Sequence, residues 1–111
     1  MKMSLEAEIE RLATDEMQQA KKENPIFKSD MDGYQAILTH MCEAGAEHNT
    51  AQDNLYELWA SVVSDDPQRA RQKVKLLREA GLNVVREMIR MAAMCEKFIH
   101  SQEDRKWGTG K

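Results

Sequence analysis

The sequence has few of the residues that support disulfide frameworks, zinc binding or β-structure. Its 111 residues include only two cysteines and two prolines, and aromatic residues make up 5% of the chain. Cys42 and Cys95 lie far apart, with no CxxC pair and no histidines at zinc-finger spacing, so we expect reduced thiols. Strand-like runs are scarce, whereas Ala, Leu and Met are common, which favours helix. The composition therefore predicts an all-α protein.

Long apolar runs and a large net charge are also absent. No stretch approaches the roughly 20 apolar residues that span a bilayer, and the N-terminal segment turns acidic where a signal peptide would become apolar. The formal net charge is -3, which gives no electrostatic reason to expect binding to nucleic acid or to an anionic membrane. We therefore expect a cytoplasmic protein without a membrane or nucleic-acid partner.

Apolar periodicity and capping residues predict three helices. Ser4 is a suitable N-cap for the first helix, and Asp66 followed by Pro67 is a strong start signal for the third. The middle of the second helix contains poor helix formers, so a break near Asn49 remains open. The expected helices cover about residues 4–22, 33–63 and 67–102. We expect one domain over residues 1–104 and a flexible tail over residues 105–111.

The two longer segments each carry an apolar row with alternating spacings of three and four residues. In the second helix the row is Tyr34, Leu38, Met41, Gly45, His48, Gln52, Leu55, Trp59 and Val62. In the third it is Val74, Leu77, Gly81, Val84, Met88, Met91, Cys95 and Phe98. Further apolar residues widen both rows, and faces this broad must pack against more than one neighbour. We therefore expect two long antiparallel helices that pair with a second copy, giving a four-helix-type bundle core in a homodimer.

The stretch LLREAGLNVVREMIRMAAMCEKFI, from Leu76 to Ile99, resembles the second acidic helix of the MazG-like superfamily of all-α nucleotide pyrophosphohydrolases. The residues that match as they stand are Arg86, Glu87, Ala92, Ala93, Met94, Phe98 and Ile99. The resemblance covers about residues 33–100. The resemblance implies cleavage of nucleoside triphosphates to monophosphate and pyrophosphate. It also implies that Mg²⁺ is held by carboxylates of this acidic helix and by an EExxE motif on the preceding helix.

Two registers place the EExxE motif on the second helix. The chemically better one aligns DNLYE with the motif and keeps three oxygen ligands, which gives the metal set Asp53, Asn54, Glu57 and Glu87. The alternative register aligns Thr39 and His40 with the glutamate pair, which gives the metal set His40, Glu43, Glu47 and Glu87. The apolar periodicity also fits a simpler interpretation, in which these acids are solvated surface residues.

The ligand set that the resemblance implies is eroded in both registers. Neither keeps two adjacent glutamates, and Arg90 stands where the family has a second acid on the third helix. We therefore predict a nucleotide- or protein-binding regulatory module. A Mg²⁺-dependent nucleoside triphosphate pyrophosphohydrolase and a purely structural helical adaptor stay open as alternatives. The fragment LYELW, from Leu55 to Trp59, is similar to some phage-encoded members and suggests a phage or mobile-element origin.

Overall fold

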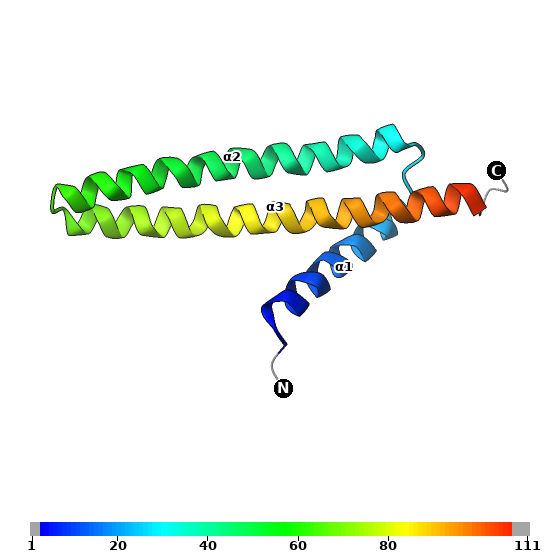
Figure 1. The fold of residues 1–111 in the computed structure, drawn as a ribbon, viewed down its shortest axis with the longest axis horizontal. Helices are drawn as coiled ribbons and strands as arrows, with labels where there is room; N and C mark the ends of the chain where they lie inside the picture. The colour runs from blue at the N-terminus through cyan, green and yellow to red at the C-terminus, as the bar shows by residue number, and fades with distance from the viewer. Residues whose placement is uncertain (1–2, 108–111) are drawn as a thin grey trace. The chain divides into compact units, whose positions relative to one another are not determined.

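The computed structural model describes residues 3–107, and within them it contains three helices and no strand. They are α1 (Leu5–Glu23), α2 (Asp30–Val63) and α3 (Pro67–Trp107), shown in Figure 1. The all-α prediction is confirmed. The chain divides into two compact units. We call Met1–Met41 with Met88–Lys111 the α1 unit, and Cys42–Glu87 the turn unit.

Helix α1 begins where the sequence predicts. The side chain of Ser4 accepts a hydrogen bond from the backbone N–H of Ala7 at 3.1 Å, which satisfies one of the free donors of the first turn. Glu6 and Glu8 lie in the first turn, where negative charge suits the helix dipole. Met17 is the buried residue of α1, and the apolar side chains of its N-terminal half remain exposed.

Helix α2 begins at Asp30, three residues before the predicted start at Gly33. The hydroxyl of Ser29 accepts a hydrogen bond from the N–H of Asp32 at 3.1 Å, as an N-cap residue does, and this cap was not predicted. Asp30 and Asp32, which precede the predicted start, belong to the first turn of the helix. The helix then continues without a break through Asn49 to Val63.

The turn between α2 and α3 contains a signal that ends α2 and a signal that begins α3. Asp65 has a positive φ of 56°, and the N–H of Asp66 donates to the carbonyl of Ser61 at 2.9 Å, as in a Schellman C-cap. The carboxylate of Asp66 then accepts a hydrogen bond from the N–H of Arg69 at 3.1 Å, with Pro67 as the first residue of α3. The predicted helix start is confirmed.

Helix α3 continues to Trp107, beyond the predicted end at about residue 102. Residues 105–107 of the expected flexible tail are therefore helical, and residues 108–111 lie outside the described residues. Within the α1 unit, Arg105 donates to the carbonyl of Phe27 and pairs with Asp30. Gln102 also donates to Asp30, at 3.1 Å. These contacts hold the end of α3 against the start of α2.

The two long helices meet through a different row of α2 from the one predicted. Within the turn unit, the less exposed residues of α2 are Ala44, Glu47, Ala51, Asn54, Glu57, Leu58, Ala60 and Ser61. We call Ala44, Glu47, Ala51, Asn54, Leu58 and Ser61 the contact row of α2. Each of Leu55, Trp59 and Val62 directly follows a residue of the contact row. They belong to the apolar row that was predicted to pack in the core, yet they are 55%, 61% and 62% exposed. The polar members of the contact row make hydrogen bonds: Glu47 with Asn83 of α3, and Asn54 and Ser61 with carbonyls one turn back on α2. Within the α1 unit, Tyr34, Leu38 and Met41 are likewise exposed.

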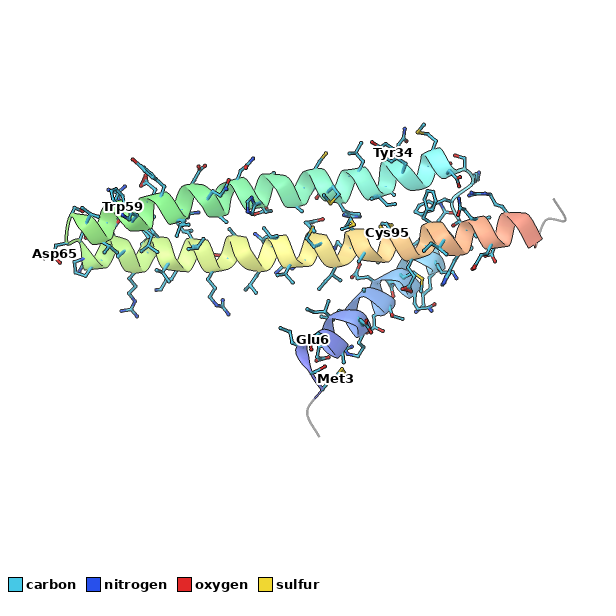
Figure 2. The ribbon with its side chains drawn as sticks, in the orientation of Figure 1. Met3, Glu6, Tyr34, Trp59, Asp65 and Cys95 are labelled. Atoms are coloured by element: carbon cyan, nitrogen blue, oxygen red, sulfur yellow. The ribbon has the colours of Figure 1, made fainter. Side chains whose placement is uncertain are left out.

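Figure 2 shows the side chains on the ribbon, with Cys95 of α3 labelled. Cys42 and Cys95 are both free thiols, and Cys95 Sγ lies 3.6 Å from the sulfur of Met91. Among the residues that the structure describes, no helix combines the length and the apolar character that crossing a bilayer requires.

Candidate metal centre

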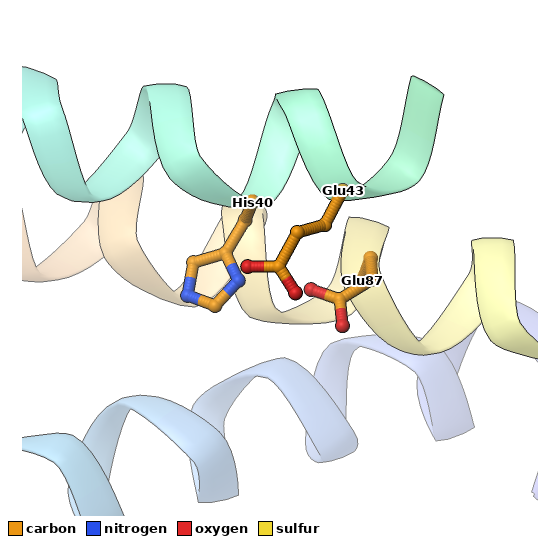
Figure 3. Close-up of side chains that lie close together, drawn as sticks. All are labelled: His40, Glu43 and Glu87. Carbon is orange, nitrogen blue, oxygen red and sulfur yellow. The ribbon is translucent and has the colours of Figure 1, made fainter. Parts of the chain in front are cut away.

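Two carboxylates of the turn unit lie close together. Glu43 projects from α2 and Glu87 from α3, and one oxygen of each lies within 4.8 Å of the other (Figure 3). Glu43 is exposed, whereas Glu87 is only 9% exposed. Within the turn unit, the buried residues of α3 are Ala80 and Glu87, and Glu43 directly precedes Ala44 of the contact row of α2. The pair is therefore open to solvent through Glu43.

His40 lies one turn before Glu43 on α2. Because α2 is a continuous helix, residues three apart share a face, and the imidazole points toward the carboxylate that follows it. One ring nitrogen of His40 lies within 4.8 Å of both carboxylate oxygens. The three side chains thus offer one nitrogen and two oxygen ligands around one point.

This donor set fits a divalent cation. A cation between Glu43 and Glu87 would offset the repulsion of two carboxylates, and a neutral imidazole is a common ligand of Zn²⁺, Mn²⁺ and Fe²⁺. Mg²⁺ prefers oxygen and is often bound by one or two carboxylates, with substrate phosphates and water completing the shell. The set therefore suits a transition metal by itself, or Mg²⁺ with oxygens supplied by a ligand.

Glu47, the fourth member of the same predicted set, has a different partner. Its carboxylate accepts a hydrogen bond from the side-chain amide of Asn83 at 3.3 Å. Asn83 in turn accepts a hydrogen bond from Arg86 at 2.6 Å. Glu47 is thus part of a polar chain that links α2 to α3, next to the group of three. Asn83 was not among the predicted site residues, because nothing in the spacing of one helix shows which residue of the other lies opposite.

The set that was preferred on chemical grounds does not come together. Glu57 pairs with Arg69, and Lys73 lies 3.9 Å from the same carboxylate. The amide of Asn54 donates to the carbonyl of Thr50 at 3.0 Å, one turn back on α2. Asp53 is exposed. Neither Asp53 nor Glu57 belongs to the group that contains Glu87.

Arg90 occupies the position that aligns with the second acid of the third helix in the MazG-like superfamily. Within the α1 unit its guanidinium lies 4.0 Å from the carboxylate of Glu16 on α1. Both side chains are about half exposed, at 41% and 46%, so this pair contributes little to stability. The residue supplies no oxygen ligand, and the structure pairs it with an acid of α1.

Comparisons with known proteins give no match: no family profile, curated protein or solved structure is similar to this chain at a significant level. The geometry of the group and the sequence resemblance therefore carry the functional argument.

Proposed function

We propose that this chain is a MazG-like helical module in which Glu43, Glu87 and His40 hold one divalent cation. The cation binds the phosphate groups of a nucleotide, and hydrolysis is inefficient. The observation that carries the proposal is the grouping of three potential ligands within 4.8 Å. They come from positions that one of the two sequence registers aligns with the metal ligands of the resembling family.

The group is small for phosphate-transfer chemistry but sufficient for binding. Two protein carboxylates and phosphate oxygens can complete the shell of Mg²⁺ or Mn²⁺. Efficient attack on a triphosphate also needs further acids that orient water or hold a second ion. Glu47 and Glu57 are engaged with Asn83 and Arg69, respectively. The hydrolase that uses Asp53, Asn54, Glu57 and Glu87 would need a different arrangement, which makes binding the better supported function.

Isothermal titration calorimetry tests this proposal. Mn²⁺ or Mg²⁺ is titrated into the protein, alone and with a nonhydrolysable nucleoside triphosphate. We expect one cation per chain, tighter binding when the nucleotide is present, and loss of binding in Glu43→Gln and in Glu87→Gln. Glu57→Gln is the matched control, because it also removes one carboxylate of α2 but lies outside the group.

The same experiment separates the alternatives. Equal weakening in the control and in the two site variants would contradict the assignment of the site. Release of pyrophosphate from a natural triphosphate at an ordinary enzymatic rate would favour the hydrolase. No cation binding with or without nucleotide would leave the structural adaptor as the better description.

We also propose that the working form is a homodimer with a bundle-type core. Large apolar side chains stay exposed within each unit, among them Tyr34 and Leu38 of the α1 unit and Leu55 and Trp59 of the turn unit. A second copy would bury such side chains. The buried apolar residues among those the structure describes are few. They are Met17, Phe27, Ala44, Ala80 and Ala93.

A further inference from the structure

One side of α3 in the turn unit carries a hollow of about 480 Å³, which is within the size range of small-molecule sites. Its lining residues all belong to α3, and successive ones are three and one positions apart in turn, so they share one side of the helix. Five of the six are exposed and Asn83 is half-buried. We call this space the basic hollow, lined by Lys75, Arg78, Glu79, Leu82, Asn83 and Arg86.

The basic hollow has an excess of positive charge. Of the lining residues that the structure describes, three are cations and one, Glu79, is an acid, which gives a formal charge of +2. Every Lys and Arg of the turn unit lies on α3, since its part of α2 and the turn contain neither. Within the described part of the chain, Lys75 and Arg78 have no acid at ion-pair distance. Their charges are therefore available to a ligand.

Arg86 is oriented at one edge of the basic hollow. Its Nη1 donates to Oδ1 of Asn83 at 2.6 Å, and the amide of Asn83 donates to Glu47 of α2 at 3.3 Å. Because these bonds restrict the guanidinium beforehand, less side-chain entropy is lost when a ligand binds. A guanidinium has five N–H donors and binds phosphate through two parallel hydrogen bonds. Arg86 thus keeps further donors for an anion.

We propose that the basic hollow is a phosphate site, in which Lys75, Arg78 and Arg86 bind the phosphate groups of a small anion. A phosphate group carries a charge of about -1.5 to -2 at neutral pH, which complements the +2 of the lining. The ligand class is pyrophosphate or the phosphate chain of a nucleotide. Binding in the hollow needs no metal ion, so the inference goes beyond the proposed cation site and does not depend on it.

The short extent of the hollow favours a small anion over nucleic acid. From Lys75 to Arg86 it covers roughly 16 Å of helix, a length over which long side chains can converge on two or three phosphate groups. Nucleic-acid binding depends on basic surface that neutralises many phosphates, whereas the whole chain has a formal net charge of -3.

Isothermal titration calorimetry with pyrophosphate tests the proposal. The full chain is titrated in EDTA, which removes divalent cations, at about 0.1 M salt, where screening limits the effect of distant charges. We expect one pyrophosphate per chain. Arg78→Gln and Arg86→Gln should each weaken binding by about 10-fold or more, the loss expected for one hydrogen bond to a charged group.

Two further variants separate the site from the general charge of the protein. Lys75→Gln should weaken binding, whereas Lys28→Gln should leave it unchanged. Lys28 is the matched control, because it is an exposed lysine of the α1 unit and does not line the hollow. Glu79→Gln should strengthen binding by about 3-fold or more, because it removes the carboxylate that repels the anion. Circular dichroism checks that each variant keeps its helices.

A nonhydrolysable nucleoside triphosphate, titrated under the same conditions, distinguishes the two sources of phosphate. Equal affinity would assign the hollow to the phosphate chain alone, and tighter binding that still requires Arg78 would add a contact with the nucleoside. Both results support the site.

Three results would overturn the inference. The first is no binding of pyrophosphate up to about 1 mM. The second is binding that Arg78→Gln and Arg86→Gln leave intact, and the third is equal weakening in Lys28→Gln and Lys75→Gln. Because EDTA is present throughout, failure of the cation proposal leaves the phosphate site standing, and loss of pyrophosphate binding leaves the cation proposal untouched.

Discussion

The backbone N–H of Phe27 donates a hydrogen bond to the hydroxyl of Ser101 at 2.8 Å, although 74 residues separate the two along the chain. Ser101 is fully buried and Phe27 is 9% exposed. This bond joins the segment between α1 and α2 to the last turns of α3. The end of α3 is thus held by a long-range contact, which the apolar periodicity of α3 does not predict.

Ser101→Ala should lower the free energy of unfolding by about 1–3 kcal/mol, because it leaves a buried backbone N–H without its acceptor. Urea unfolding followed by circular dichroism measures the change. Ser61→Ala is the control: Ser61 is equally buried, but its hydroxyl donates to the carbonyl of Glu57 one turn back in the same helix. A similar loss in both variants would show that the bond between Phe27 and Ser101 has no special weight.

Gly33→Ala should destabilise the protein by about 1–3 kcal/mol, the range for adding a group to a filled site. A Cβ at this position would overlap the ring of Phe98, and Phe27 lies 3.1 Å away on another side. Gly45→Ala is the matched control, because nothing lies within 4 Å of a Cβ there. It should be neutral or stabilising by up to about 1 kcal/mol. Thermal unfolding measures both changes. Stabilisation by Gly33→Ala together with destabilisation by Gly45→Ala would contradict the packing of Gly33.

Asp65→Gly should raise the stability by about 0.5–1 kcal/mol. Asp65 has a φ of 56°, a region that glycine adopts without the steric cost of a Cβ. The gain should appear as a higher midpoint in thermal unfolding. Asp65→Ala offers a comparison, since it removes the same carboxylate but keeps the Cβ, and it should not stabilise. If both variants gained equally, the charge rather than the backbone conformation would be responsible.

Lys97 should make stability depend on pH in the alkaline range. Burial lowers the pKa of its amine from 10.5, and Lys21 lowers it further, whereas Glu23 raises it. Lys97 is 4% exposed, and its amine lies 4.4 Å from the centre of the Phe27 ring. Because the folded pKa is the lower one, the unfolded chain binds the proton more tightly. Stability therefore rises as pH increases from the folded pKa toward 10.5.

Lys97→Met removes this dependence and keeps most of the packing volume. The difference in unfolding free energy between the variant and the wild type should shift in favour of the wild type as pH rises from about 7 toward 10.5. Urea unfolding of both proteins across that range measures the shift, and other alkaline titrations cancel in the comparison. Parallel stability curves for the two proteins would contradict the lowered pKa.

The sequence predicted the helices well because their signals are local. Ser4, Asp66 and Pro67 act within one turn of the helix ends that they define. The early start of α2 was missed because Asp30 and Asp32 suit a turn as well as a first helical turn. Ser29, the residue that decides between the two, was not considered as a cap. The late end of α3 depends on Arg105 and its contact with Phe27, a long-range interaction that periodicity cannot reveal.

The candidate site was predictable only as a choice between registers. Counting oxygen ligands favoured Asp53, Asn54 and Glu57, but such a count says nothing of which residues of α3 lie opposite. The structure places Arg69 beside Glu57 and Glu87 beside Glu43. The largest apolar residues of α2 were expected to be buried, yet Ala44 and its small or polar equivalents form the contact row. Side-chain size alone did not identify the side of α2 that meets α3.

The most direct test of the central claim is an anomalous diffraction experiment on crystals grown with Mn²⁺. We expect one strong peak per chain between Glu43 and Glu87, about 2.0–2.3 Å from a ligand atom of each and of His40, the range for such metal–ligand bonds. The peak should be absent from Glu87→Gln crystals grown in the same way. A wild-type map with no peak there, or a peak that persists in the variant, would contradict the assignment of these residues as metal ligands.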